Sequence, residues 1–307
     1  MPLIGLRKSN GPNGFGHNTT AEQVTEGLDL SGKTYLLTGC NSGIGLETLR
    51  VIALRGGHVI AAARTKEKAQ TAIKRTKSEG NATPIACELS DPGSVRAAVN
   101  EIKALGRPLD GIICNAGIMA LPKPERKYGL ELQFFTNHIG HFILVTGLLD
   151  TLAADSRVVI TASEAHRRAP REGIRFDDLG AEKEYTPWSS YGHSKLANIL
   201  FAKELARRFD GNGRTANSLH PGVIHTGLVR HMNPLVNIVL TIARPFFLKS
   251  VAQGAATQCY LATHPNASAH NGEYFSDCNP ARPTRPGRDG EMAQRLWDVS
   301  EEITSRI

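Results

Sequence analysis

The stretch Thr38-Gly39-Cys40-Asn41-Ser42-Gly43-Ile44-Gly45 decides the fold of this chain. It follows a β-rich apolar run, Lys33–Thr38, and opens a segment with helical spacing, Gly43–Arg55. Gly39 permits a tight turn, Gly43 lets the backbone approach a pyrophosphate, and Gly45 allows the helix to pack closely on the sheet. The helix N-terminus then offers N–H groups and a positive dipole to phosphates. A glycine-rich turn without a ligand is the alternative, but the strand–turn–helix order favours a dinucleotide site.

Strand-like and helix-like segments alternate along the rest of the chain. The expected strands are Lys33–Thr38, His58–Ala62, Thr83–Cys87, Leu109–Cys114, Arg157–Thr161, Thr215–Leu219 and Glu273–Phe275. The expected helices are Gly43–Arg55, Lys66–Glu79, one opened by Asp91-Pro92, one over about Leu130–Leu152, and Ser189–Phe209. The strands are continuous apolar runs, which is typical of parallel strands buried on both faces. We therefore expect an α/β fold: a single Rossmann-type, doubly wound parallel sheet of about seven strands, with helices on both faces.

Composition and the N-terminus limit the class of protein. Residues 1–20 are polar and glycine-rich and are predicted to form a flexible arm before one catalytic domain, 21–307. The N-terminus does not have the pattern of a secretory signal, and no run of eighteen apolar residues predicts a membrane span.

The five cysteines are scattered, without metal-ligand spacing, which predicts no metal site and fits the cytoplasm. The formal charge of +7 lacks a block of like charges, so nucleic acid is not an expected partner.

The end of the second expected strand indicates which dinucleotide binds. A site that selects NAD usually carries Asp or Glu there for the ribose 2′-hydroxyl. This chain has Ala63-Arg64 instead, followed by Lys66. Arg64 offers a planar, permanently charged fork to a 2′-phosphate, so NADP (NADPH) is the expected cofactor. The alternative is a solvated arginine at a helix start.

Tyr191 and Lys195 are the expected centre of the chemistry. They are four residues apart in a helical stretch, so their side chains share one face. A neighbouring ammonium favours tyrosinate and lowers the phenol pKa, which lets the phenol exchange a proton with a carbonyl or alcohol oxygen. Ser163 follows the fifth expected strand, at the sheet edge where such folds bind ligands, and its hydroxyl could hydrogen-bond the reacting oxygen.

Several motifs together resemble the short-chain dehydrogenase/reductase superfamily. They are Gly39-x-x-x-Gly43-x-Gly45, Asn115-Ala116-Gly117, Asn137, Ser163, Tyr191-x-x-x-Lys195 and Pro221-Gly222, in that order, over about Ser31 to Phe275. Within that superfamily, the sequences of the motifs are most similar to those of the retinol dehydrogenase and WW-domain-oxidoreductase branch. The strings that carry this likeness are TGCNSGIGLE (38–47), NHIGHF (137–142), YGHSKLAN (191–198) and HPGVIHT (220–226).

The resemblance implies a role for each matching residue. Tyr191 would be the general acid in reduction and the base in oxidation, Lys195 would lower its pKa and hold the nicotinamide ribose, and Ser163 would orient the substrate oxygen. Asn137 would support a water that relays protons to Lys195. Glu88 stands where the family commonly has an Asp near the adenine. The implied cofactor-binding set is Gly39, Asn41, Ser42, Gly43, Ile44, Gly45, Arg64, Glu88, Leu89, Asn115, Ala116, Gly117, Tyr191, Lys195, Pro221, Gly222, Val223 and Thr226.

Two segments are expected to face the substrate. The insertion at about 164–188 is typical of the retinol-dehydrogenase branch, and 226–250 contains a strongly apolar run, 232–248. That run suits a lid over an apolar substrate, a packing or dimer helix, or a contact with a membrane surface. The resemblance also implies a homodimer or homotetramer through the helices at about Leu130–Leu152 and Ser189–Phe209. His138, His141, His166 and His193 lack metal-ligand spacing and are assigned no catalytic role.

The predicted function is hydride transfer between NADP(H) and a small-molecule carbonyl or alcohol, with a lipophilic substrate favoured. Two alternatives stay open. One is a regulatory or scaffold protein that binds NADP(H), although binding alone would not need the Ser163, Tyr191 and Lys195 set. The other is a reductase of a conjugated C=C bond.

Overall fold

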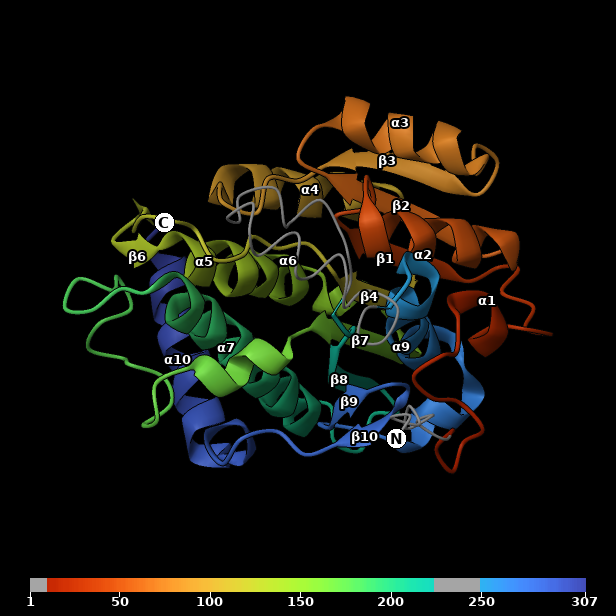
Figure 1. Cartoon of the computed structure of the whole chain (residues 1–307). Coiled ribbons are helices and arrows are strands. Elements are labelled where there is room, and N and C mark those ends of the chain that lie inside the picture. The colour runs from red at the N-terminus through yellow and green to blue at the C-terminus, as the bar shows by residue number, and fades with distance from the viewer. Residues whose placement is uncertain (1–9, 224–248) are drawn as a thin grey trace, which may run out of the picture.

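An eight-stranded sheet forms the centre of the computed structural model, which describes residues 10–223 and 249–307 (Figure 1). Its strand order is β10-β9-β8-β7-β4-β1-β2-β3. The strands are β1 (Thr34–Thr38), β2 (His58–Ala63), β3 (Ala82–Ala86), β4 (Leu109–Cys114), β7 (Leu152–Thr161), β8 (Thr215–His220), β9 (Tyr274–Ser276) and β10 (Asn279–Ala281). Neighbouring strands pair in parallel, and β10 is antiparallel to β9. The predicted α/β class and doubly wound sheet are confirmed, and β10 adds a strand that was not expected.

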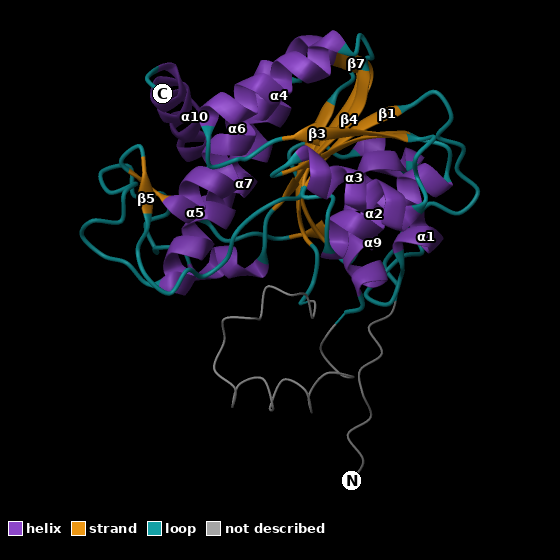
Figure 2. Ribbon diagram, turned by 90° about the horizontal axis from the view of Figure 1, so that it is seen from above, coloured by secondary structure: helices purple, strands orange, loops and turns teal. Residues whose placement is uncertain are grey.

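Helices cover both faces of the sheet (Figure 2). One face carries α1 (Ala21–Val24), α2 (Gly43–Leu54), α3 (Lys66–Thr76) and α9 (Val251–Thr263). The other carries α4 (Pro92–Ala104), α6 (Gly140–Gly147), α7 (Pro187–Arg208) and α10 (Gly290–Ser305). Alternate strand residues enter the two cores: Leu36 packs on the α7 side, and Tyr35 and Leu37 pack on the α9 side. Because both faces are buried, the strands need apolar residues at nearly every position.

The helix expected at about Leu130–Leu152 is shorter and less regular than predicted. Its first two residues form β6 (Leu130–Glu131), which pairs with β5 (Arg126–Lys127), and the Glu131 side chain caps α5 (Leu132–Phe134). A π-helical segment, η1 (Phe135–Ile139), joins α5 to α6, and a 3₁₀ turn, η2 (Leu149–Thr151), leads into β7. Strand β7 therefore starts five residues before the expected Arg157, because Leu152 already pairs with Leu109 of β4.

Two helices close to the C-terminus, α9 and α10, were not predicted. Most of α9 is buried, so its sequence has no polar face to mark a helical period. Trp297 of α10 packs edge-on against Phe142 of α6 at 5.0 Å between ring centroids, and against Phe201 of α7 at 5.8 Å. The two helices that we expected to form a subunit contact are thus covered, at these residues, within the same chain.

Residues 10–20 of the N-terminal segment pack against the rest of the fold. The Phe15 ring meets Tyr260 of α9 at 5.8 Å, edge to face, and the Asn13 side chain donates to the Cys278 carbonyl at 2.6 Å. Thr20 caps α1 in a reciprocal capping box with Gln23. Residues 1–9 lie outside the described part. In residues 10–223 and 249–307, no helix has both the length and the apolarity to cross a bilayer.

Candidate active site

The glycine loop links β1 to α2 at the carboxyl edge of the sheet, beside the point where β1 lies between β2 and β4. Open α/β sheets bind ligands at this kind of topological switch point. Gly39 has a φ of +70°, and a Cβ on Gly45 would lie 2.1 Å from the Gly39 carbonyl oxygen. Side chains larger than glycine would therefore disrupt the turn and the close approach of α2.

The N-terminus of α2 has the features of a phosphate cradle. Ser42 is its N-cap residue and makes no capping hydrogen bond with its side chain. By contrast, the Thr65 and Asp91 side chains cap α3 and α4. The first N–H groups of α2 and the helix dipole are thus free to meet an anion, as a pyrophosphate requires.

A network of hydrogen bonds joins this loop to the Asn115-Ala116-Gly117 turn. The Thr38 hydroxyl accepts from the backbone N–H groups of Asn115 and Ala116, each at 3.0 Å. The Asn115 amide donates to the Thr38 carbonyl at 2.9 Å. A Cβ on Gly117 would lie 2.9 Å from Asn137 Oδ1 and 3.6 Å from Lys195 Nζ. The turn therefore brings the expected cofactor edge next to the expected catalytic residues.

His141 extends this network to Asn137. Its Nδ1 lies 3.0 Å from the Asn137 carbonyl and its Nε2 lies 2.9 Å from the Thr38 hydroxyl. Burial lowers the pKa of His141 to about 4, so the ring is neutral at pH 7. Because a carbonyl can only accept, Nδ1 carries the proton and Nε2 accepts from Thr38. No motif marks this link, since Thr38 and His141 are 103 positions apart.

Arg64 and Glu88 follow the ends of β2 and β3. Arg64 is exposed and forms no hydrogen bond or ion pair with any other residue in 10–223 or 249–307. Its guanidinium is therefore available to an anionic ligand. The Glu88 carboxylate instead accepts from the Ser90 N–H at 3.1 Å and from the Ser90 hydroxyl at 3.0 Å. One carboxylate oxygen of Glu88, the residue expected near the adenine, is thus already hydrogen-bonded within its own loop.

Tyr191, Lys195 and Ser163 come together from α7 and the end of β7. Lys195 is buried and donates from Nζ to the carbonyl of Thr161, the last residue of β7, at 2.9 Å. The same ammonium lies 5.6 Å from the centroid of the Tyr191 ring. Ser163, two residues beyond Thr161, lies close enough to the Tyr191 phenol to lower its pKa. The three side chains expected to carry the reaction are therefore neighbours.

The protonation of this group follows from burial. Burial raises the pKa of the Tyr191 phenol to about 12, and the hydrogen bond with Ser163 acts in the opposite direction. Burial also lowers the pKa of Lys195 to about 8, and Cys114 acts in the opposite direction. Tyr191 is therefore protonated at pH 7, as a proton donor must be, and Lys195 is still mostly charged.

Asn137 lies in the π-helical segment η1 and positions α7. Its Nδ2 donates to the Ile118 carbonyl and to the Ser194 hydroxyl, both at 2.9 Å, and its Oδ1 accepts from the Ile118 N–H at 2.8 Å. Ser194 in turn donates to the Tyr191 carbonyl at 2.7 Å. Asn137 thus connects the turn after β4 to the helix segment that carries Tyr191 and Lys195.

The Pro221-Gly222-Val223 segment follows β8 at the same edge of the sheet. Gly222 has a φ of +98°, and a Cβ there would lie 2.5 Å from Cδ of Lys249. The Lys249 ammonium is buried and pairs with Asp277 at 2.6 Å. Neither Lys249 nor Asp277 was expected from the sequence. Thr226 and the apolar run 232–248 lie outside the described residues.

Histidines support the site without joining it as acids or bases. The Nε2 of His193 accepts from the Arg175 N–H at 3.1 Å, which holds the 164–188 insertion to α7 between Tyr191 and Lys195. The Nδ1 of His166 donates to the Ser163 carbonyl at 2.6 Å. Burial lowers the pKa of both rings, that of His193 to about 4. The sequence analysis gave these histidines no catalytic role, and the Arg175 N–H that His193 accepts from lies 18 residues away.

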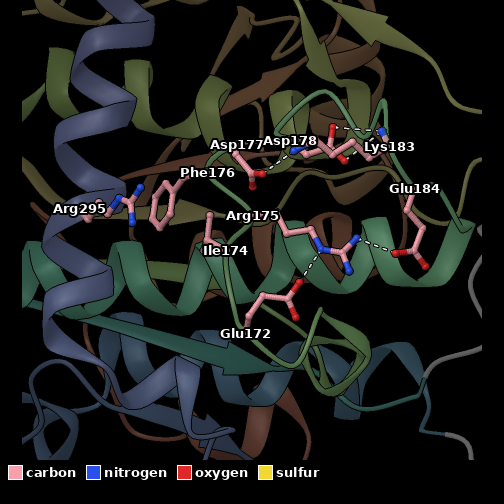
Figure 3. A pocket seen from close by; sticks show the side chains of 9 residues that line it. All are labelled: Glu172, Ile174, Arg175, Phe176, Asp177, Asp178, Lys183, Glu184 and Arg295. Atoms are coloured by element: carbon pink, nitrogen blue, oxygen red, sulfur yellow. Dashed lines mark hydrogen bonds and ion pairs between the residues drawn. The ribbon is translucent and has the colours of Figure 1, made fainter.

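A cavity of about 580 Å³ lies between the 164–188 insertion and α10 (Figure 3). Arg175 lies at its centre and pairs with Glu172 at 2.7 Å and Glu184 at 2.9 Å. Arg295 of α10 lies over the Phe176 ring at 4.1 Å. The lining does not include Tyr191, Ser163 or Lys195, and its main charges are paired with one another. This cavity is therefore separate from the group of Tyr191, Ser163 and Lys195, and its charged lining does not suit an apolar substrate.

Comparison with protein families agrees with this geometry. The family model described as short chain dehydrogenase matches residues 33–175. The chloroplastic short-chain dehydrogenase TIC 32 B of Brassica napus is 39% identical, over 97% of this chain and 96% of its own length. Retinol dehydrogenase 12 of Mus musculus is 38% identical, over 91% of this chain and 88% of its own length. The WW domain-containing oxidoreductase of Homo sapiens is 37% identical over 93% of this chain and 71% of its own length.

Solved structures share the fold. A crystal structure of an uncharacterised protein from Mycobacterium Paratuberculosis superposes with a TM-score of 0.75 at 32% identity, covering 94% of this chain and 98% of that one. A short chain dehydrogenase from Burkholderia cenocepacia, solved in complex with NADP, superposes with a TM-score of 0.62 at 25% identity. The superposition covers 80% of this chain and 96% of that one.

Proposed function

The chain belongs to the short-chain dehydrogenase family, in its retinol dehydrogenase-like branch, and on this premise we propose that it transfers hydride between NADP(H) and a carbonyl or alcohol carbon. The observation that carries the proposal is the contact of Tyr191 with Ser163 and Lys195, beside a glycine loop on the same sheet edge. A protein that only bound the dinucleotide would not need a proton donor there.

The cofactor-binding half of the proposal rests on the glycine loop and Arg64. The uncapped N-terminus of α2 suits the pyrophosphate, and the glycines at 39 and 45 allow the tight turn and the close packing of α2 that place this N-terminus at the sheet edge. The unpaired guanidinium of Arg64 suits the 2′-phosphate of NADP, where NAD would favour a carboxylate. The short chain dehydrogenase from Burkholderia cenocepacia was solved in complex with NADP, which supports the same choice.

In the proposed mechanism, the residues hold the substrate oxygen and supply its proton. The bound nicotinamide would supply or accept the hydride. Ser163 and the Tyr191 hydroxyl would both hydrogen-bond the substrate oxygen, and Tyr191 would donate its proton in reduction or accept one in oxidation. The Lys195 ammonium stabilises the tyrosinate that reduction leaves behind. Asn137 holds this part of α7 through Ser194 and is proposed to support the water that returns a proton to Lys195.

The substrate is proposed to be a lipophilic carbonyl compound or alcohol, and the cytoplasm is the proposed compartment. The likeness to retinol dehydrogenase 12 supports the first proposal, because the name of that relative specifies a lipophilic alcohol. The five cysteines are all buried and free, which supports the second.

The experiment is a panel of aldehydes, ketones and quinones of graded hydrophobicity, scored by oxidation of NADPH. We expect turnover of some carbonyl compounds, with KM falling as apolar surface increases. Saturation of conjugated C=C bonds with carbonyls left intact would instead identify the ene-reductase reaction. Tight binding of NADPH without turnover of any compound would contradict the proposal and favour a regulatory protein.

A further inference from the structure

Trp188, Tyr191 and Lys195 form one stripe along α7. They are spaced by three and then four residues, so they project from the same face of the helix. Lys195 is buried, whereas Tyr191 and Trp188 are half-buried. The rings of Trp188 and Tyr191 meet edge to face, with 6.2 Å between centroids. Trp188 is therefore the next side chain along the stripe, beyond the phenol and away from the buried lysine.

Arg168 also lies against this tryptophan. It ends the short 3₁₀ helix η3 (Glu164–Arg168), whose N-cap residue is Ser163, and its Cζ lies 5.1 Å from the centre of the Trp188 ring. Ser163 and Arg168 thus come from the two ends of one short 3₁₀ helix. The first faces the phenol and the second faces the tryptophan.

Arg168 is the unpaired charge of this turn. Glu164 is already engaged, because it accepts from Arg167 at 2.6 Å and from the Tyr274 hydroxyl at 3.0 Å. Arg168 is exposed and forms no hydrogen bond or ion pair with another residue in the described ranges. Its contact with Trp188 is with the ring face and uses no N–H donor in a hydrogen bond within the described ranges, so those donors remain available to a ligand.

We infer that the substrate carries an anionic group at the end opposite its reacting carbon, and that Trp188 and Arg168 select it. The inference rests on the function proposed above and specifies its substrate class. With the carbonyl oxygen at Tyr191 and Ser163, an apolar body lies along Trp188 and reaches Arg168. A guanidinium forms two parallel hydrogen bonds with a carboxylate or a similar oxyanion. Arg168 is a specificity-determining residue in this account and takes no part in proton transfer.

The test uses aryl aldehydes whose carboxylate lies at three distances from the aldehyde. The two groups are separated by one ring, by one ring and a short chain, or by two rings. Each is matched by its neutral methyl ester. KM and kcat are measured with NADPH for the wild-type protein and for Arg168→Gln. The control variant is Arg171→Gln, because Arg171 is exposed on the same segment and makes no contact of this kind within the described residues.

In the wild-type protein, we expect one carboxylate spacing to have a KM lower than that of its ester by about three- to tenfold at low salt, the range of a modest charge-assisted contact. The preference should shrink as salt is added. Arg168→Gln should abolish it while kcat and the KM of the ester change by less than about twofold, and Arg171→Gln should retain it. Equal KM values for acid and ester in the wild-type protein, or equal losses in the two variants, would overturn the inference.

Tryptophan fluorescence separates this inference from the proposed function. The chain has two tryptophans, and Trp297 is buried in the core between α6, α7 and α10, so Trp188 is the one that a ligand at the site would quench. If no compound of the carbonyl panel is turned over, the proposed function fails, but the aryl carboxylates can still be titrated in the presence of NADP⁺. Quenching that depends on Arg168 would support the anion contact on its own, and quenching that is the same in Arg168→Gln would overturn it.

Discussion

Arg64 determines the choice between the two nicotinamide dinucleotides in our account. Its side chain follows β2, is exposed and is unpaired within the described residues, so its guanidinium is available to a negatively charged ligand. In Arg64→Asp we expect the kcat/KM ratio of NADPH over NADH to fall by about ten- to a hundredfold, because a charge-assisted contact is lost and a repulsive carboxylate is added.

Steady-state kinetics with both cofactors provide the measurement, and Arg75→Asp is the matched control, because Arg75 is exposed in the last turn of the helix that follows Arg64. An unchanged ratio in Arg64→Asp would show that this residue does not contact the 2′-phosphate. A comparable fall in Arg75→Asp would attribute the effect to net charge.

Residues that act through their neighbours in sequence were predictable, and residues that act across the fold were not. Gly39 and Gly45 make contact within one turn, and Tyr191 and Lys195 are one helical turn apart, so spacing alone indicated their relation. His141 acts through a partner 103 residues away, and only the fold brings that partner within reach. The reach of Arg168 over Trp188 likewise depends on how η3 turns back toward α7.

At the scale of secondary-structure elements, the close contact between η3 and α7 depends on Gly192. A Cβ on Gly192 would lie 2.4 Å from the Ala165 carbonyl oxygen and 2.8 Å from the Ala169 nitrogen, both backbone atoms of the η3 region. Gly192→Ala must therefore push η3 and Ser163 away from the neighbouring Tyr191. We expect kcat to fall by about tenfold or more, and the melting temperature to fall by several degrees, as overpacking costs about 1–3 kcal/mol.

Gly290→Ala is the control for this substitution, since a Cβ at the start of α10 meets no atom within 4 Å. The measurements are kcat with a substrate from the carbonyl panel and thermal unfolding of both variants. If Gly192→Ala has the kcat of the wild-type protein, then the position of η3 is not set by this contact.

Element boundaries were less predictable than element types. The strands β1, β2 and β4 matched their apolar runs, but the helix expected at about Leu130–Leu152 begins and ends inside strands. Its π-helical segment adds a residue to the turn around Asn137, and no residue pattern predicts that insertion. Helix α9 is covered on nearly every side, so its sequence lacks the polar face that periodicity analysis needs.

At the scale of the whole molecule, buried neutral histidines make the fold sensitive to acid. Burial lowers the pKa of His138 to about 3, and those of His141, His193 and His220 to about 4, from an ordinary value of 6.5. Above pH 6.5 these rings are neutral in both the folded and the unfolded chain. Below it, the unfolded chain takes up protons that the folded chain refuses down to about pH 4, so stability is lost as the pH falls through this window.

We therefore expect the free energy of unfolding to decrease from pH 7 to pH 5, by up to about 1.4 kcal/mol per histidine for each pH unit well below 6.5. Denaturant unfolding at pH 7.5, 6.5 and 5.5 measures how the free energy of unfolding depends on pH. In His193→Gln this dependence should be weaker, because unfolding takes up at most one proton fewer. A free energy of unfolding that stays constant between pH 7 and pH 5 would show that these rings are not held neutral.

The whole sheet places the residues of the proposed reaction at one edge. The glycine loop follows β1, the Asn115 turn follows β4, Ser163 follows β7 and Pro221 follows β8. The order of these motifs along the sequence indicated the fold, since parallel strands bring their carboxyl ends to the same side. The sequence could not show how α10 covers α6 and α7, because that packing depends on a C-terminal helix with no motif of its own.

Tyr191→Phe tests the central claim most directly, because it removes only the phenol oxygen and keeps the ring beside Trp188 and Lys195. The measurement pairs kcat for the best carbonyl substrate with the dissociation constant of NADPH. We predict a loss of about a hundredfold or more in kcat, the size of a general-acid contribution, with the dissociation constant of NADPH changed by less than about threefold. Turnover at the wild-type rate in Tyr191→Phe would contradict the assignment of Tyr191 as the proton donor.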